Sequence, residues 1–233
     1  MKKIGLIGGT GPESTLVYYR ELNTRINEMT LGRRFPELSI ESVDLFTALK
    51  YVSEERYDEL TDYLYEKIKN LEDGGAEIVA LTAATMHVVY DRLKEKVTVP
   101  FISIPEAAAD FALKKGYKKV GMLGTIFTME NDYLSKAFTE KGIEVVVPDK
   151  ASRVLVHDII SKELEFGDVK ASSVDKLLSV IKDMIVRENI EAVILGCTEL
   201  PLAINAETSP VDVLDIMEIH INKLVELETE VKG

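Results

Sequence analysis

The sequence predicts an α/β fold of two pseudo-symmetric domains, each a parallel sheet flanked by helices. Three observations predict it: short apolar runs alternate with amphipathic stretches, the opening pattern starts again after Gly116, and Gly-rich or Thr-rich segments follow several predicted strands. Ligands of open parallel sheets usually bind at the carboxyl ends of the strands. We therefore expect the active site in a cleft between the two domains.

The first half is predicted to alternate strictly between strands and helices. In chain order we expect a strand over Lys3–Gly8, a helix over Glu13–Glu28, a strand over Leu38–Leu45, a helix over Glu54–Asp73, a strand over Ala76–Thr82, a helix over Met86–Glu95, a strand over Phe101–Ile104 and a helix over Glu106–Lys115. The first helix carries Leu16, Tyr19, Leu22 and Ile26 at helical spacing, and Thr85 is a candidate N-cap. This order is typical of a parallel sheet covered on both faces.

The second half repeats the first. The segment Tyr117–Thr125 resembles Met1–Gly9, and Asn189–Cys197 resembles Gly74–Thr82. We assign residues 1–97 and 208–233 to the first domain and residues 98–207 to the second.

The composition argues against nucleic acid and membranes as partners. The 233 residues include 28 Lys and Arg against 40 Asp and Glu, a formal net charge of −12, whereas nucleic-acid binders usually show a clustered basic surface. No apolar run approaches the roughly 18 residues of a membrane span. We expect a protein of the cytoplasm with neither nucleic acid nor a membrane as its partner.

The chain has a single cysteine, Cys197, which excludes an internal disulfide and a thiolate metal cluster. It lies where a strand ends and a helix is expected to begin, and a helix N-terminus lowers the pKa of a thiol. Cys197 is therefore a candidate base, the alternative being a small buried apolar residue. Because His157 and His220 have no ligand spacing, we expect no metal site.

Two segments after first-half strands are suited to bind an anion. Gly8–Thr15 is neither a Walker A loop nor a complete dinucleotide fingerprint, but it offers backbone N–H groups at a helix N-terminus. The alternative is a tight turn that needs glycine for its dihedral angles. Thr82–His87 offers hydroxyl and N–H groups, and its alternative is an ordinary N-cap at Thr85 with His87 filling the first helical turn.

Two lysines are candidates to bind an acidic side chain. Lys162 is the first and Lys50 the second. For Lys162 the alternative is a solvated helix face, where it pairs with Glu163 or Glu165.

Four motifs in order resemble the aspartate/glutamate racemase family: Gly8–Thr15 with Tyr18 and Tyr19, Thr85-Met86-His87, Leu123-Gly124-Thr125 with Thr128-Met129-Glu130, and Leu195–Glu199. The resemblance covers nearly the whole chain. It implies two α/β domains around a cleft, a homodimer, no cofactor, and racemisation of an acidic amino acid by two facing cysteines. One thiolate removes the α-proton and the other thiol returns a proton to the opposite face.

The sequence departs from the family at the first cysteine. Related members read Cys-Thr-Asn-Thr-Met-His where this chain has Thr82-Ala83-Ala84-Thr85-Met86-His87. Thr82 then replaces the cysteine, although a shorter family variant aligns Ala83 with it. A hydroxyl is a poor general base but can still donate a proton.

The resemblance therefore implies a racemase with unequal acid/base groups. Cys197 holds the place of the cysteine that attacks the L enantiomer, and Thr82 is expected to reprotonate the other face, which biases the enzyme toward the L substrate. The residues expected to hold the substrate α-carboxylate are Ala84, Thr85, Thr125 and Thr198, with Thr10 nearby.

Other functions are open on the same scaffold. Maleate isomerase, hydantoin racemase and arylmalonate decarboxylase are related, and the last uses one essential cysteine to protonate a carbanion. A decarboxylase or isomerase is one alternative. A non-catalytic module that binds an amino acid is another.

Overall fold

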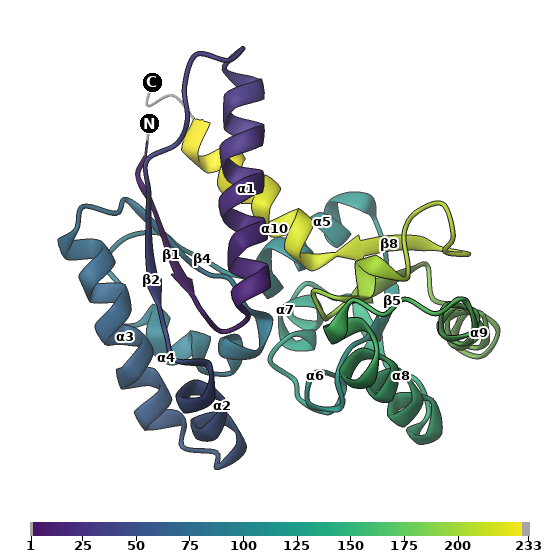
Figure 1. Cartoon of the computed structure of the whole chain (residues 1–233). Helices are drawn as coiled ribbons and strands as arrows, with labels where there is room; N and C mark the ends of the chain where they lie inside the picture. Colours follow the sequence, from purple (N-terminus) through teal and green to yellow (C-terminus); the bar gives the residue numbers. More distant parts are fainter. Residues whose placement is uncertain (1, 230–233) are drawn as a thin grey trace. The chain divides into compact units, whose positions relative to one another are not determined.

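The structure is a computed structural model that describes residues 2–229 and forms two compact α/β units (Figure 1). The first unit contains the described chain up to Ile104 and the segment from His220, and the second runs from Pro105 to Ile219. The boundaries therefore differ from those predicted at residues 97 and 208. The reason is strand pairing: Phe101 and Ile102 still pair with the first sheet, and Asp212–Asp215 pairs with the second.

The first unit contains a parallel sheet of four strands in the order β2-β1-β3-β4. Its strands are β1 (Ile4–Gly8), β2 (Leu38–Ser42), β3 (Ile78–Leu81) and β4 (Phe101–Ile102), and its helices are α1 (Pro12–Met29), α2 (Leu45–Ser53), α3 (Tyr57–Asp73), the 3-10 helix η1 (Ala84–Val89), α4 (Tyr90–Lys94) and most of α10 (Ile216–Thr229).

Helices cover both faces of the first sheet. Figure 1 shows α3 on one side of β1 and β2 and α1 on the other. Four α1 residues are buried and lie four residues apart, Ser14, Tyr18, Leu22 and Ile26, while Leu16 and Tyr19 are exposed. Of the four apolar residues at helical spacing, Leu22 and Ile26 are therefore in the core, whereas Leu16 and Tyr19 are not.

Two predicted elements of this unit have different ends. The strand from Leu38 stops at Ser42, and the Asp44 carboxylate accepts a hydrogen bond from the Thr47 amide at 2.6 Å, which caps α2. The helix predicted from Met86 is instead η1 followed by α4, and its N-cap residue is Ala83 rather than Thr85. The Thr85 N-cap prediction is wrong.

The second unit contains a second parallel sheet of four strands, in the order β6-β5-β7-β8. Its strands are β5 (Lys119–Leu123), β6 (Glu144–Val146), β7 (Ala192–Leu195) and β8 (Asp212–Asp215), and its helices are α5 (Ile104–Lys115), α6 (Ile126–Glu130), α7 (Ser135–Glu140), α8 (Lys150–Lys162), η2 (Leu164–Phe166), α9 (Ala171–Glu188) and η3 (Leu200–Leu202).

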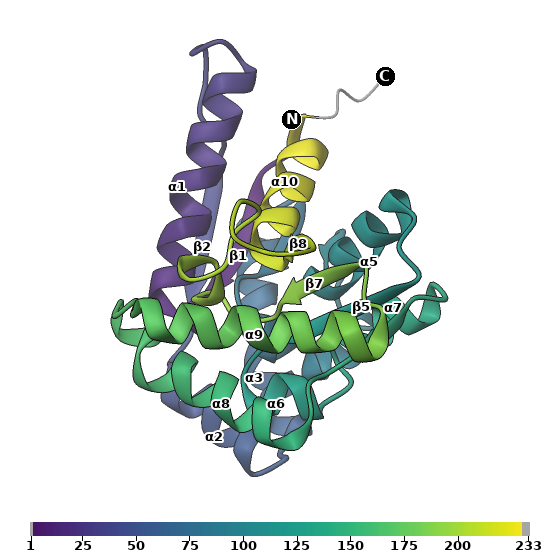
Figure 2. The same cartoon turned by 90° about the vertical axis from the view of Figure 1, so that its right-hand side faces the viewer.

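The core of the second unit lies under α8 and α9, which pack side by side (Figure 2). Buried residues of α8 and α9, among them Ile160 and Ile181, belong to one hydrophobic cluster with Leu123 of β5 and Val193 of β7. The central strands β5 and β7 are buried on both faces, as their continuous apolar runs predict. The predicted fold class is confirmed: two parallel sheets, each flanked by helices.

Candidate active site

Each unit has a topological switch point, where the chain leaves one central strand and later returns on its other side. In the first sheet it lies between β1 and β3, and in the second between β5 and β7. The loops that follow these strands start at Gly9, Thr82, Gly124 and Gly196, and they contain most of the predicted site residues. Each unit therefore carries part of the predicted site at the carboxyl edge of its own sheet.

In the first unit, hydroxyl groups join the two loops. The Gly9 amide donates to Thr15 Oγ1 at 3.0 Å, and Thr15 Oγ1 lies 3.2 Å from Thr82 Oγ1. Thr82 Oγ1 also donates to the Ile7 carbonyl at 3.1 Å, and the Thr82 side chain is 1% exposed. The Thr82 hydroxyl proton is thus held by the backbone of β1, an arrangement that does not favour its predicted role as a proton donor.

The strand registers also bear on which residue matches Cys197. Ile7 pairs with Leu81 in the first sheet, as Leu123 pairs with Leu195 in the second. The backbone amide after each of these pairs makes the same hydrogen bond in both sheets. Thr82 N–H donates to the Ile7 carbonyl, and Gly196 N–H donates to the Leu123 carbonyl. Thr82 therefore corresponds to Gly196, and the residue that corresponds to Cys197 is Ala83. This register favours the alternative alignment over the one that we preferred from the sequence.

The other predicted residues of the first unit lie close to these loops. Thr10 is half-buried between Gly9 and Gly11, and its Oγ1 is a buried oxygen without a hydrogen-bond partner. Ala84 and Thr85 form the first turn of η1 and are also half-buried. The Thr10 hydroxyl is an available donor at this edge of the sheet.

Two buried histidines support the first-unit loops. His87 Nε2 accepts from the Ile104 amide at 3.1 Å, so its proton is on Nδ1, which lies 3.1 Å from the Ala84 carbonyl. His220 Nδ1 contacts Tyr18 Oη at 2.7 Å, and its Nε2 contacts the Ile102 carbonyl at 3.1 Å. Burial lowers the pKa of His87 to about 4 and that of His220 to about 3. Both rings are neutral structural groups, as the alternative interpretation of His87 proposed.

Because these histidines are buried and neutral, we expect the free energy of unfolding to decrease at acidic pH. Below the pKa of an unfolded histidine, near 6.5, the unfolded chain binds protons that the native chain does not, so stability falls as the pH falls toward 4. Each histidine contributes a slope of up to about 1.4 kcal/mol per pH unit. Urea denaturation between pH 7 and pH 5 measures that slope, and it should be smaller in His220→Gln than in the wild type. An equal slope in both proteins would contradict the assignment.

In the second unit, the first of the two loops is organised by threonines. Thr125 caps α6, its Oγ1 accepting from the Thr128 amide at 3.3 Å, and Thr128 Oγ1 lies 3.0 Å from Tyr133 Oη. A Cβ atom on Gly196 would lie 2.9 Å from the Leu123 carbonyl oxygen. This close approach explains why glycine precedes Cys197.

Cys197 is partly buried and its thiol is hydrogen-bonded to Glu199. Cys197 Sγ donates to Glu199 Oε2 at 2.8 Å, and Thr198 Oγ1 donates to Glu199 Oε1 at 2.7 Å. Burial raises the pKa of the Cys197 thiol, and the negative charge of Glu199 raises it further. The predicted lowering of this pKa is wrong, because only the three-residue η3 follows and it starts at Leu200.

Sequence reasoning missed the carboxylates beside this thiol. Glu199 belongs to the motif Leu195–Glu199, but the sequence predicts no role for its side chain. Glu165 of η2 is a second acidic group: burial raises its pKa, and the charge of Glu199 raises it further. Only the spacing of Glu199, two residues after Cys197, was visible in the sequence.

The two candidate lysines are in exposed positions. Lys162 ends α8, is 69% exposed and pairs with Asp158 at 3.0 Å. That geometry matches the solvated-face alternative, although the partner differs from the two glutamates predicted. Lys50 is exposed on α2.

Among residues 2–229, no cluster of three His, Cys, Asp or Glu side chains has the arrangement of a metal site. No helix in this part of the chain has the length and apolar character that a membrane span requires.

Comparison with known proteins identifies the family of this chain. A sequence model of the family described as Asp/Glu/Hydantoin racemase matches residues 7–224. The crystal structure of an aspartate racemase homologue from Pyrococcus horikoshii is 42% identical, with a TM-score of 0.89 over 99% of this chain and 100% of that one. A putative Asp/Glu racemase from Yersinia pestis is 32% identical, with a TM-score of 0.94 over 99% of this chain and 100% of that one.

A more distant relative is longer than this chain. The glutamate racemase of Aquifex pyrophilus is 29% identical over 147 residues, which are 62% of this chain and 55% of that enzyme. This chain therefore matches about half the length of that relative. The family match and the two similar structures establish that the chain belongs to the Asp/Glu/hydantoin racemase family, whose racemases are isomerases.

Proposed function

We propose that the protein transfers the α-proton of an acidic amino acid, aspartate or glutamate, with Cys197 as its acid/base group and without a cofactor. The observation that carries this proposal is the hydrogen bond of 2.8 Å from the Cys197 thiol to Glu199, at the carboxyl end of β7. A thiol in contact with a carboxylate can pass on its proton and become a base. The names of the similar aspartate and glutamate racemases support the choice of substrates.

The proposed reaction begins with transfer of the thiol proton from Cys197 to Glu199. The thiolate then takes the α-proton and forms an S–H bond, while the electron pair of the broken C–H bond stays on Cα as a carbanion. Hydrogen bonds to the substrate α-carboxylate stabilise this charge. Because the pKa of Cys197 is raised, the positive α-ammonium group of the substrate is needed nearby to favour the thiolate.

We place the α-carboxylate against the backbone and hydroxyl groups that follow the central strands. The residues proposed to hold it are Ala84, Thr85, Thr125 and Thr198, with Thr10 nearby. The unpartnered Thr10 hydroxyl supports this proposal, since a bound carboxylate would supply its missing acceptor. For the cation that binds the side-chain carboxylate, Lys162 stays the first prediction and Lys50 the second.

The two faces of the substrate are proposed to be treated unequally. Cys197 serves the L substrate, and the match of Ala83 to Cys197 leaves a methyl group where a second thiol would stand. Protonation of the other face then depends on Thr82 or on water, and solvent returns a proton to the alkoxide or hydroxide that is left while Glu199 gives its proton back to solvent. We expect α-proton exchange of the L substrate to be faster than its inversion. Since mirror-image products have equal free energy, the bias can appear only in saturated turnover or in exchange without inversion.

The test is incubation with L- and D-aspartate and glutamate in heavy water, followed by measurement of α-deuterium and of chirality. For the wild type we expect deuterium to enter an L substrate faster than the D enantiomer accumulates. An added thiol that faces the substrate should speed inversion by about 10²-fold or more. Ala83→Cys is expected to do so and Thr82→Cys is not; the reverse result would show that Thr82, as predicted from the sequence, is the second group.

The same experiment tests the alternatives. No α-deuterium incorporation with any of the four amino acids, together with turnover of a malonate or maleate substrate, would identify a decarboxylase or isomerase with one thiol. The methyl group of Ala83 favours this candidate. Binding of an amino acid without any exchange would identify a binding module. The homodimer and the cytoplasmic location that the family implies stay predictions.

A further inference from the structure

The first unit contains a cavity of about 480 Å³ at the edge of its sheet opposite the switch point. Its lining residues precede the strands: Lys2 and Lys3 lie before β1, Glu37 before β2, and Glu77 before β3. The predicted site loops follow the same strands. The cavity is therefore separate from the first-unit loops of the reaction site, and its volume is in the range of small-molecule pockets.

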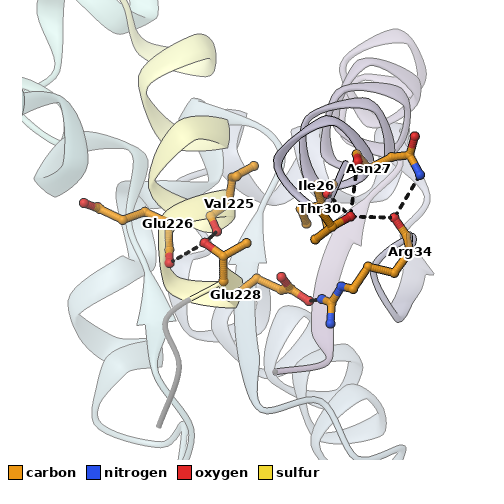
Figure 3. Close-up of polar contacts among 8 residues, drawn as sticks. Ile26, Asn27, Thr30, Arg34, Val225, Glu226 and Glu228 are labelled. Carbon is orange, nitrogen blue, oxygen red and sulfur yellow. Dashed lines mark hydrogen bonds and ion pairs between the residues drawn. The ribbon is translucent and has the colours of Figure 1, made fainter. Parts of the chain in front are cut away.

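An ion pair with incomplete hydrogen bonding forms one wall of the cavity. Figure 3 shows Glu228, in the last turn of α10, facing Arg34 in the loop after α1. The Glu228 side chain is 1% exposed, and its Oε1 is paired with Arg34. Glu228 Oε2 and Arg34 Nε are buried and have no hydrogen-bond partner. A buried carboxylate is costly unless its second oxygen is also satisfied, so this wall has one acceptor and one donor available.

The position of Arg34 is held by its own loop. Its carbonyl accepts from Asn27 Nδ2 at 3.1 Å and from Thr30 Oγ1 at 3.4 Å (Figure 3). Thr30 also donates to the Ile26 carbonyl at 2.8 Å, which ties the loop to the end of α1. The Arg34 wall is thus a built part of the fold, whereas the Glu228 carboxyl group can turn about its last torsion, which is broad.

The charges around the cavity balance. Its ionisable lining residues are three cations and three carboxylates: Lys2, Lys3, Arg34, Glu37, Glu77 and Glu228. A polyanion such as a nucleotide or a polycation such as a polyamine would add an unbalanced charge to this wall. A molecule with one positive and one negative group is matched on both sides.

An aromatic ring completes the lining. Phe35 borders the cavity and is 64% exposed, so its ring is accessible to a ligand. It follows Arg34 directly, so an apolar surface lies next to the charged wall.

We propose that this cavity binds a zwitterionic amino acid with an apolar or aromatic side chain, at a site distinct from the reaction site. The ammonium group pairs with the carboxylates, Glu228 Oε2 among them, the carboxylate pairs with the lysines and Arg34, and the side chain packs on Phe35. This ligand class differs from the acidic substrates of the proposed reaction, and the site does not depend on that reaction.

Isothermal titration of the full chain with L-phenylalanine tests the proposal. We expect saturable binding with a dissociation constant of roughly 1 mM, as for a small ligand with two charged groups. 3-Phenylpropionate lacks the ammonium group and 2-phenylethylamine lacks the carboxylate, so each should bind at least about tenfold more weakly. Equal binding of all three compounds, or no saturable heat up to about 20 mM, which is twenty times the expected constant, would overturn the proposal.

Two variants and a competition experiment locate the site. Phe35→Ala, a change at an exposed residue, should weaken binding about fivefold or more, while Phe46→Ala, at a ring that is 81% exposed on α2 and outside the cavity, should leave it unchanged. Glu228→Gln should also weaken it. L-Aspartate at a concentration that saturates the reaction site should not displace L-phenylalanine from the cavity. Displacement, or no effect of Phe35→Ala, would place the ligand elsewhere and refute the proposal, whether or not the protein is a racemase.

Discussion

Replacement of Cys197 by serine is expected to lower the rate of α-proton exchange with L-aspartate or L-glutamate by at least about 10³-fold. The physical reason is acidity: a serine hydroxyl is a far weaker acid than a thiol, so almost no alkoxide forms near neutral pH. Glu199 cannot compensate, because a serine hydroxyl holds its proton far more tightly than a thiol does. The rate of deuterium incorporation from heavy water measures this loss directly.

The serine variant should keep its fold. The serine hydroxyl is smaller than the thiol and can donate to Glu199, as the thiol does. Its melting temperature and circular dichroism should therefore be close to those of the wild type, which separates loss of the base from loss of structure. A folded Cys197→Ser variant that retains more than about a tenth of the exchange rate, rather than a thousandth, would place the base on another residue.

The second large effect is expected on stability, from Gly9→Ala. Gly9 has a φ of +87°, and a Cβ atom there would lie 2.4 Å from the Val43 carbonyl oxygen and 2.5 Å from Ser42 Oγ. The neighbouring strand end must move to admit the methyl group, so we expect a loss of about 3 kcal/mol or more in the free energy of unfolding. Urea denaturation measures the change.

Gly32→Ala is the matched control for this substitution. Gly32 has a φ of +75°, but nothing lies within 4 Å of a Cβ atom built there. Only the cost of a left-handed backbone remains, about 1 kcal/mol. If the two variants lost equal stability, close contact with Val43 would not explain the requirement for glycine at position 9.

The sequence predicts the repeated strands correctly, but it predicts their ends less well. The runs around Ile4, Ile78, Val120 and Val193 are strands, because runs buried on both faces of a sheet are apolar throughout. The strand predicted from Leu38 extends to Leu45 because an apolar residue at position 45 fits a strand as well as a helix. The capping hydrogen bond of Asp44 decides for the helix.

The strand β8 shows a different limit. Residues 212–215 were assigned to the first domain, but Ala192 pairs with Asp212 in the second sheet. Pairing between parallel strands far apart in the chain has no signal in local composition, so a domain boundary near such a strand depends on the fold.

At the candidate active site, the sequence by itself determined the family-like motifs, the single thiol and the absence of a second one. It did so because these are statements about residue identity and order. Only the tertiary structure decided that Ala83 matches Cys197, since register depends on hydrogen bonds between strands. Only the structure decided that the Thr82 hydroxyl is held by Ile7 and that the pKa of Cys197 is raised, because burial and the charge of Glu199 act through space.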